Sequence, residues 1–152
     1  MYTFRQAIVD DLDQLLKFEQ ELIQVERGMD PTIQEGKISY YNIANYIEAE
    51  DTEVLVATLD NTIVASGYAR IKTDRHYLQH DLQGHLGFMY VAPEHRGKGL
   101  NAQIIDRLIT WCAARNVHEI RLDVYEDNPS AIRAYEKVGF KKHMIKMRLN
   151  VK

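Results

Sequence analysis

The segment from Val91 to Leu100, Val-Ala-Pro-Glu-His-Arg-Gly-Lys-Gly-Leu, combines glycine and basic residues where a strand is expected to meet a long helix. Glycine lets the backbone approach a ligand closely, and the first turn of a helix leaves its N–H groups without intrahelical acceptors. The helix dipole, Arg96 and Lys98 add positive charge at the same end. The segment predicts a site for a phosphate or pyrophosphate. The alternative is a plain strand-to-helix turn with solvated basic side chains.

The glycine spacing excludes two familiar phosphate-binding motifs. The Rossmann fingerprint needs three glycines near the first strand of a strand–helix–strand unit, and an acidic residue about 20 residues later. This segment has only Gly97 and Gly99, in the middle of the chain. The phosphate loop of nucleotide hydrolases needs Gly-x-x-x-x-Gly-Lys-Ser/Thr, a string that the sequence lacks.

A second motif lies downstream: Asn128-Pro129-x-Ala131-x-x-x-Tyr135-x-Lys137-x-Gly139-Phe140. In combination with Val91, Pro93, Arg96 and Gly99, it resembles the GNAT superfamily of N-acyltransferases, which use acetyl-coenzyme A. The two motifs occur in the family's order and cover roughly residues 85–140. Asn101 departs from the pattern, because the family usually has Gly or Ala at this position.

The resemblance implies an α/β (α+β) fold, a mixed central sheet with helices on both faces, and a single domain over residues 1–152. It also implies two neighbouring parallel strands, over 85–91 and 119–124, that diverge to admit the pantetheine arm of the coenzyme. Backbone groups near Met89, Tyr90 and Val91 would pair with this arm. N–H groups of one continuous run would hold the pyrophosphate: Arg96, Gly97, Lys98, Gly99, Leu100 and Asn101.

The resemblance gives Tyr135 the role of a general acid that protonates the departing thiolate. A phenol with a pKa of about 10 suits this step, because thiolate pKa values are close enough for a nearly balanced proton transfer. A tyrosine that only packs in the core is the alternative. Asn128 would cap the short helix that carries Tyr135, contact the coenzyme, or do both.

The general base is less apparent from the sequence. Many relatives carry a Glu four residues before the Val of Val-x-Pro, and here that position is Gly87. His85 lies on the same strand face as Gly87, and an imidazole titrates in the useful range. His85 is therefore the candidate base. A strand-end histidine without this role, and a water chain to backbone carbonyls, are the alternatives.

The expected activity is direct transfer of acetyl from acetyl-coenzyme A to a primary amine of a small molecule or peptide, within a ternary complex. The alternative is a non-catalytic acyl-coenzyme A sensor or interaction module with the same fold. No metal is expected, because His76, His80 and His85 follow no ligand pattern and the chemistry needs none. Cys112 lies on an apolar helix face and is expected to be a buried hydrophobe.

Acidic residues and tyrosines are concentrated in the segments expected to form the acceptor pocket, about 20–50 and 73–84. They are Glu21, Glu26, Asp30, Glu35, Asp74 and Asp81, with Tyr40, Tyr41 and Tyr77. Carboxylates would hold an ammonium group of a basic acceptor, and tyrosines would cover its methylenes. The alternative is that the acids face water and the tyrosines are packing residues.

The hydrophobic periodicity predicts the elements that must position these groups. Strands are expected at 3–9, 54–59, 63–71, 85–91 and 119–124, and a final one at about 140–149. Helices are expected from Asp10 or Asp11 to Gly28, over 37–49, from about 100 to 115, and in a short stretch that ends before Gly139. The pair Asp60-Asn61 indicates a hairpin turn between the second and third strands.

Composition fits one globular domain, with 45% apolar and 27% charged residues among 152. The net charge of −3 argues against a general nucleic-acid binder. It combines −9 over residues 1–60 with +6 over residues 133–152. The sequence has neither an apolar run of membrane length nor a signal-peptide pattern, and its one cysteine forms no internal disulfide, so a cytoplasmic protein without a membrane partner is expected. A second copy of the chain remains a candidate partner.

Overall fold

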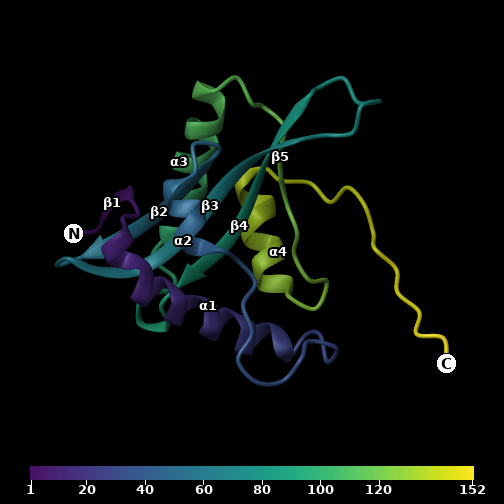
Figure 1. Ribbon diagram of the computed structural model, residues 1–152, viewed down its shortest axis with the longest axis horizontal. Coiled ribbons are helices and arrows are strands. Elements are labelled where there is room, and N and C mark those ends of the chain that lie inside the picture. Colours follow the sequence, from purple (N-terminus) through teal and green to yellow (C-terminus); the bar gives the residue numbers. More distant parts are fainter.

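A five-stranded sheet forms the centre of the computed structural model, which describes residues 1–152 (Figure 1). The strands are β1 (Thr3–Gln6), β2 (Thr52–Leu59), β3 (Thr62–Thr73), β4 (Leu82–Val91) and β5 (Ile120–Leu122). They neighbour one another in sequence order; β1 to β4 are antiparallel, and β5 is parallel to β4. The mixed sheet of the expected fold class is confirmed.

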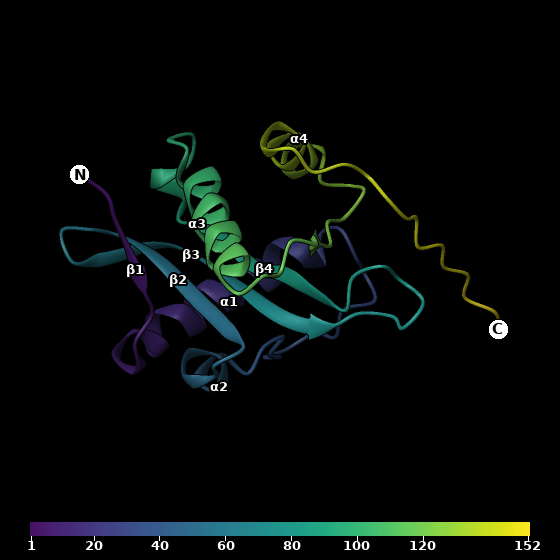
Figure 2. The same ribbon diagram turned by 90° about the horizontal axis from the view of Figure 1, so that it is seen from above.

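The helices cover both faces of this sheet (Figure 2). On one face lie α1 (Leu12–Arg27) and α2 (Ile43–Glu48), and on the other lie α3 (Leu100–Ala114) and α4 (Pro129–Val138). Short 3-10 turns, Val9–Asp11 and Pro93–His95, precede α1 and α3. Each face has its own apolar cluster, because both faces of the sheet are covered by helices.

The amphipathic pattern explains how the two long helices pack. Helix α1 buries Leu15, Phe18 and Ile23 against the sheet and ends at Gly28. Helix α3 buries Ile104 and Leu108 against the other face. Between β2 and β3, Asp60 and Asn61 both have positive φ, 50° and 66°, as a two-residue turn matched to strand twist requires.

A β-bulge interrupts β4 near its middle. Ser66 pairs with Tyr90 and Tyr68 with Gly87, so Gly67 opposes two residues, Phe88 and Met89. Phe88 has a φ of 54°, and its carbonyl accepts a hydrogen bond of 3.0 Å from the Ser66 hydroxyl. The extra residue reverses the alternation of side chains. Leu86 therefore faces α3, whereas Phe88 and Tyr90 face α1.

Several sequence predictions differ from the structure. The strands expected at 3–9 and 119–124 are shorter, Thr3–Gln6 and Ile120–Leu122. The helix expected over 37–49 is only α2, because the Asn42 side chain accepts from the Asn45 N–H and begins the helix there. The strand expected at about 140–149 does not form. Residues 140–152, the C-terminal tail, run away from the body without secondary structure (Figure 2), and the Ile145 side chain is 86% exposed.

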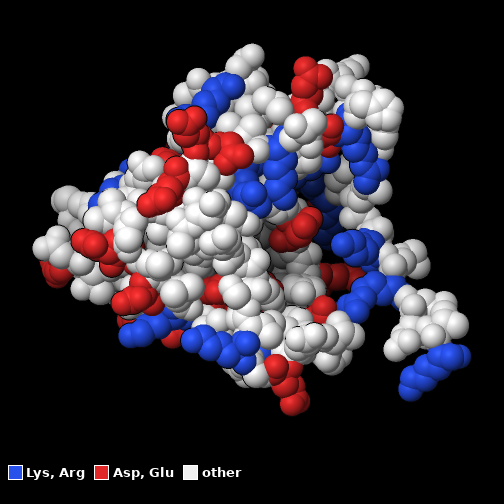
Figure 3. All heavy atoms as spheres, viewed as in Figure 1, with Lys and Arg blue, Asp and Glu red and all other residues white.

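Charge is unevenly spread over the surface. Figure 3 shows basic side chains along the tail, and carboxylates recessed in the hollow between the body and the tail. No helix of the structure has the length and apolar character needed to cross a membrane.

Candidate functional site

The loop between β4 and α3 presents a row of free backbone donors. Gly97 and Gly99 have φ values of 74° and 77°, which L side chains rarely adopt, and the space beside both is open. Gly99 caps α3 without a side-chain hydrogen bond. None of the N–H groups of residues 97–102 donates a hydrogen bond within the protein. The predicted anion site therefore has the geometry that a pyrophosphate needs.

Side chains add charge beside these donors. The Arg96 Nε donates 2.9 Å to the Val91 carbonyl, and the guanidinium lies 5.8 Å from the centre of the Tyr90 ring. Lys98 is exposed, whereas Leu100 is buried in the core and offers the site only its backbone. The cationic groups and the helix dipole thus reinforce one another at the start of α3.

Strands β4 and β5 diverge beside this loop. Their pairing covers only Gly84–Leu86 against Ile120–Leu122. From Gly87 to Val91, the edge of β4 has no strand neighbour on the β5 side, as expected for a strand pair that admits an extended ligand between them. In this stretch Met89 packs toward α3, and Tyr90 packs toward α1.

Helix α4 carries the candidate acid. Asn128 caps the helix by accepting from the Ala131 N–H at 3.3 Å, and Gly139 ends it with a φ of 122°. The half-buried Tyr135 ring packs 6.1 Å from the Phe140 ring. Burial raises the pKa of Tyr135, and the charge on Glu26 raises it further. The hydroxyl therefore holds its proton at neutral pH, as an acid must.

Glu26, near the end of α1, lies at the centre of a group of tyrosines. Burial raises the pKa of its own carboxyl. Burial also raises the pKa values of Tyr40, Tyr41 and Tyr125, and the Glu26 charge adds to each of these shifts. The Tyr40 hydroxyl is buried without a hydrogen-bond partner. The fold thus brings one carboxylate and four hydroxyls, including that of Tyr135, into one neighbourhood.

Glu19 positions two of these tyrosines, a role that the sequence analysis missed. Its fully buried carboxylate accepts 2.9 Å hydrogen bonds from the N–H groups of both Tyr40 and Tyr41. Glu19 and Glu26 are seven residues apart, so they share one face of α1. The available signal was an acidic residue within the apolar face of that helix, between Phe18 and Leu22.

The structure places most of the other expected acceptor residues elsewhere. Glu21 contacts the Tyr90 hydroxyl. Asp30 binds Thr32 and Arg148, and it also accepts a 3.5 Å hydrogen bond from the Tyr125 hydroxyl. Glu35 and Asp81 are exposed. Of the expected acceptor residues, Glu26, Tyr40 and Tyr41 therefore lie in one neighbourhood, with Asp30 at its edge beside Tyr125.

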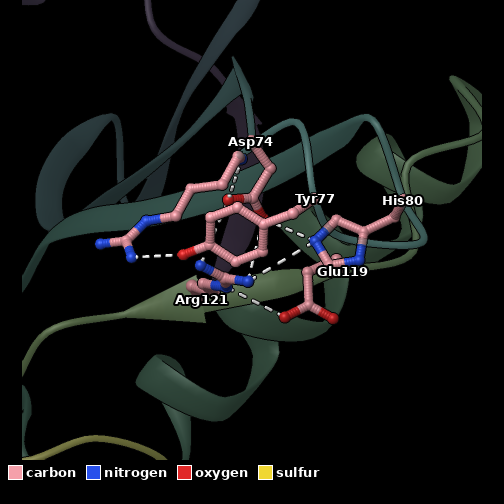
Figure 4. A network of polar contacts seen from close by, with 6 residues as sticks. Asp74, Tyr77, His80, Glu119 and Arg121 are labelled. Atoms are coloured by element: carbon pink, nitrogen blue, oxygen red, sulfur yellow. Dashed lines mark hydrogen bonds and ion pairs between the residues drawn. The ribbon is translucent and has the colours of Figure 1, made fainter.

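A separate polar network holds the loop between β3 and β4 against β5 (Figure 4). Asp74 binds His80 at 2.5 Å and Arg121 at 2.9 Å, and Arg121 also binds Glu119 at 2.9 Å. Tyr77 accepts from Arg75 and is 64% exposed. Asp74 and Tyr77 are thus engaged in this network and do not join Glu26.

His85 lies on β4 before the bulge. Burial lowers its pKa, and the charges of Lys72 and Arg70 lower it further, whereas Asp123 opposes them. The imidazole is therefore neutral at neutral pH and able to accept a proton. At Gly87, a Cβ would overlap the Tyr68 hydroxyl and lie 2.5 Å from the ring carbon Cζ. Tyr68 thus fills the space of the side chain that Gly87 lacks.

Two other groups considered in the sequence have different settings. No group of three or more His, Cys, Asp and Glu side chains is arranged to hold a metal ion. Cys112 is fully buried on α3, and burial raises the pKa of its thiol to about 11. The thiol is therefore protonated at neutral pH and a poor nucleophile.

The family assignment follows from comparison with known proteins. Residues 15–140 match the model of the acetyltransferase (GNAT) family. This span contains most of α1, the whole of β2 to β5, and the loop between β4 and α3 with its free N–H groups at 97–102, the anion loop. The chain belongs to the GNAT acetyltransferase family. Its fold, diverging strands and glycine loop are the family features that the sequence motifs predicted.

Curated relatives of this GNAT chain include N-acetyltransferases. An N-alpha-acetyltransferase of Saccharolobus solfataricus is 28% identical over 149 residues, which is 93% of this chain and 81% of that protein. A spermidine N(1)-acetyltransferase of Vibrio cholerae is 41% identical over 51 residues, which is 33% of this chain and 30% of that protein.

Solved structures share the GNAT fold over nearly the whole chain. A variant of the BH1408 protein from Bacillus halodurans has a TM-score of 0.87 at 21% identity, covering 99% of both chains. A predicted acetyltransferase of Clostridium acetobutylicum, solved with acetyl-coenzyme A, has a TM-score of 0.76 at 22% identity. That comparison covers 99% of this chain and 96% of the other.

Proposed function

We propose that this protein transfers the acetyl group of acetyl-coenzyme A to a primary amine of a small molecule or peptide. The observation that carries the proposal is the row of free N–H groups at residues 97–102, beside the unpaired edge of β4. An anion site next to a free strand edge suits a ligand that joins a pyrophosphate to an extended chain of amides. The GNAT relative from Clostridium acetobutylicum binds acetyl-coenzyme A.

The donor would bind mainly through backbone groups. N–H groups of residues 97–102 would hold the pyrophosphate, and Arg96 and Lys98 would add charge. The amides of the pantetheine arm would pair with β4 between Gly87 and Val91, in the manner of an added strand. Asn101 does not disturb this arrangement, because its N–H group is the binding element. The thioester would then lie between the bulge of β4 and Tyr135.

The reaction would proceed by direct attack. The amine nitrogen forms a bond with the thioester carbonyl carbon, and N–H groups near Met89 and Tyr90 stabilise the oxygen as it becomes negative. The bond from carbon to sulfur then breaks. The Tyr135 hydroxyl gives its proton to the leaving sulfur, and the proton lost by the amine returns to Tyr135 through the base and solvent. The products are an amide and free coenzyme A.

His85 would be the base that receives the amine proton. Its lowered pKa keeps the imidazole neutral and ready to accept. It lies two residues before Gly87, roughly 7 Å away along the strand, so the proton must pass through an intermediate group. The Tyr68 hydroxyl, which fills the space beside Gly87, is well placed to relay it, with water completing the path.

The acceptor would be a cationic amine. The charge of Glu26 raises the pKa values of Tyr40, Tyr41, Tyr125 and Tyr135, so a carboxylate and several aromatic rings would surround the substrate. A carboxylate binds an ammonium group, and tyrosine faces stabilise cations and cover methylenes. We therefore infer the class of acceptor from Glu26, and not from the substrates that the names of the relatives give.

A second candidate function is a non-catalytic sensor of acyl-coenzyme A. The observation that favours it is Gly87, because the strand carboxylate that many relatives carry is replaced by the packed ring of Tyr68. Such a protein would keep the anion loop and the strand divergence but would form no amide.

Two measurements on one preparation separate these functions. Calorimetry measures acetyl-coenzyme A binding, and a thiol assay measures coenzyme release with polyamines, aminoglycosides, amino acids and peptides. The proposal predicts binding and release that depends on an amine. Binding without release with any acceptor would favour the sensor, and no binding would contradict both.

A further inference from the structure

Arg70 on β3 is a half-buried cation without a carboxylate beside it. Its guanidinium lies 4.2 Å from the centre of the Tyr46 ring and donates a 2.9 Å hydrogen bond to the Tyr46 hydroxyl. The Arg70 Nε is buried and has no hydrogen-bond partner. None of the ion pairs of the structure includes Arg70. A partly desolvated guanidinium without a paired anion is costly, so this side chain is suited to bind an anionic group of a ligand.

Arg107 on α3 provides a comparison within the same chain. Its guanidinium also lies over an aromatic ring, 4.0 Å from the centre of Phe4, but Arg107 is exposed. Water therefore solvates the charge of Arg107, whereas the Arg70 Nε is shielded from water. The burial of Arg70, and not its stacking on a ring, is thus the feature that favours binding of an anion.

Arg70 lies on the sheet face that carries the proposed acceptor site. It pairs in register with His85 of β4, and Tyr68, on the same face of β3, lies opposite Gly87. Burial raises the pKa of Tyr68 to about 12 and lowers the pKa of His85, and the charge of Arg70 acts to lower both values. Asp123, after β5, acts on both groups in the opposite direction, yet it forms no ion pair with Arg70. The guanidinium is therefore a neighbour of the proposed base.

A row of tyrosine rings connects Arg70 with the surroundings of Glu26. Neighbouring ring centres are 5.3 Å to 5.7 Å apart along the row Tyr46, Tyr68, Tyr41 and Tyr40. At the far end of the row, burial raises the pKa of Tyr40, and the charge of Glu26 raises it further. The face thus has a carboxylate near one end, a guanidinium at the other and aromatic rings between them. Aromatic rings suit the methylene groups of a chain that joins two charged groups.

We propose that Arg70 binds a carboxylate of the acceptor, so that the acceptor is an amine joined to a carboxylate by a short aliphatic chain. This inference rests on the proposed acetyl transfer and names the class of its acceptor. The reacting amine lies near Glu26 and the thioester, the chain covers the tyrosine rings, and the carboxylate binds the guanidinium.

The length of the strand limits the length of this acceptor. From His85, opposite Arg70, to Phe88 in the bulge, β4 advances by roughly 10 Å. The amine and the carboxylate of glycine share one carbon and are too close together to reach both ends. An amino acid whose amine lies at the far end of its chain, or the side-chain amine of a diamino acid, has a suitable length.

Acceptors that differ only in charge test the role of Arg70. The compounds 6-aminohexanoate and 6-aminohexanamide have the same length, so coenzyme release with each isolates the contribution of the carboxylate. For the wild type, kcat/KM for the acid should exceed that for the amide by roughly 10–100-fold, as expected for hydrogen bonds between charged groups. Arg70→Gln should bring this ratio close to one, whereas Arg107→Gln, the matched control, should keep it. Glycine should be a poor acceptor.

The same comparison separates this inference from the proposed function. Equal use of the acid and the amide by the wild type would overturn the role of Arg70 and leave acetyl transfer standing. A preference that Arg70→Gln retains would also overturn it. If circular dichroism shows that Arg70→Gln does not fold, Arg70→Lys, which keeps the charge but loses the two-pronged guanidinium, should lower the ratio in part.

Binding gives a readout that does not depend on turnover. Calorimetry on protein saturated with coenzyme A measures the affinity for 6-aminohexanoate and for its amide. The wild type should bind the acid at least roughly 10-fold more tightly, and Arg70→Gln should bind the two alike. Selective binding of the acid without coenzyme release would contradict acetyl transfer and keep the carboxylate site. Equal binding of acid and amide by the wild type would overturn the site.

Discussion

At the scale of single residues, Tyr135 and Glu26 form the centre of the proposed chemistry. They come from α4 and α1, on opposite faces of the sheet, and the charge of Glu26 raises the pKa of Tyr135. The raised pKa of Tyr135 keeps its proton available, and burial raises the pKa of the Glu26 carboxyl. Substitution of Tyr135 should therefore affect proton donation to the leaving sulfur, whereas substitution of Glu26 should affect binding of the acceptor.

Tyr135→Phe should lower kcat with little change in acetyl-coenzyme A affinity. The substitution keeps the ring packed on Phe140 but removes the proton donor, and general acid catalysis contributes roughly 10²–10⁴-fold. Steady-state kinetics and calorimetry measure the two effects separately. Tyr77→Phe, in the exposed loop before β4, is the control and should turn over normally. A wild-type rate for Tyr135→Phe would show that Tyr135 only packs in the core and donates no proton.

Glu26→Gln should raise KM for a cationic acceptor and leave KM for acetyl-coenzyme A unchanged. For the wild type, a raised pKa means that Glu26 gains its proton at a higher pH than an ordinary Glu, so acceptor KM should rise as pH falls through that value. The variant should lose this contribution to the pH profile. Glu35→Gln, an exposed acid of the same region, should match the wild type. An acceptor KM that Glu26→Gln leaves unaltered would exclude the ammonium-binding role.

Gly87→Ala should destabilise the fold and lower activity, since the added Cβ overlaps the Tyr68 ring. Overpacking of this kind costs about 1–3 kcal/mol. A second change, Tyr68→Leu, removes the overlapping atoms and should restore stability in the double variant, but not activity if the Tyr68 hydroxyl relays the proton. Chemical denaturation and turnover distinguish the two effects. Equal stability of Gly87→Ala and the wild type would show that Tyr68 has room to move.

Some residues of the candidate site could be named from the sequence, and others could not. Arg96, Gly97, Gly99 and Tyr135 were identified because they lie in local motifs whose order carries meaning. Glu19 was missed because its partners, the N–H groups of Tyr40 and Tyr41, come from a loop far along the chain. Glu26 was one of six equivalent acids, and only the path of α1 past the end of the sheet separated it from the others.

At the scale of elements, the start of α3 is the proposed site of coenzyme binding. Its free N–H groups depend on the positive φ of Gly97 and Gly99, which let the loop turn away from the donors. The field at this end of the helix favours an anion, and it is strengthened by the cationic side chains beside it.

Arg96→Glu and Gly99→Glu should each abolish measurable binding of acetyl-coenzyme A. Each variant places a carboxylate against the pyrophosphate, and Gly99→Glu also forces a side chain onto a φ of 77°. Arg115→Glu reverses a charge at the opposite end of α3 and should bind normally. Calorimetry with circular dichroism as a folding check makes the comparison. Normal affinity for acetyl-coenzyme A in both loop variants would show that the pyrophosphate does not bind at the start of α3.

Strong local patterns explain which elements were predictable. Helices α1 and α3 and the hairpin of β2 and β3 follow directly from periodicity and from Asp60-Asn61. The helix expected over 37–49 was too long because its first half is fixed by contacts with α1 that no local pattern reveals. The strand expected over 140–149 has the right alternation, but a strand also needs a neighbour, and no strand of the sheet pairs with the tail.

At the scale of the whole molecule, the fold brings distant segments to one opening in the sheet. The anion loop follows β4, Tyr135 comes from α4, and Glu26 comes from the end of α1. Local sequence could not predict this convergence, because it depends on where β4 and β5 separate. The family resemblance implied that these two strands diverge, and their pairing is indeed limited to Gly84–Leu86 and Ile120–Leu122.

Transfer of a labelled acetyl group tests the central claim most directly. The protein is incubated with acetyl-coenzyme A carrying 13C in its acetyl group and a mixture of polyamines, amino acids and peptides, and the products are analysed by mass spectrometry. We expect a labelled acetyl group on an amine nitrogen, formed in proportion to coenzyme release and lost in Arg96→Glu. Coenzyme bound normally by the wild type, with no labelled amide from any acceptor, would contradict it.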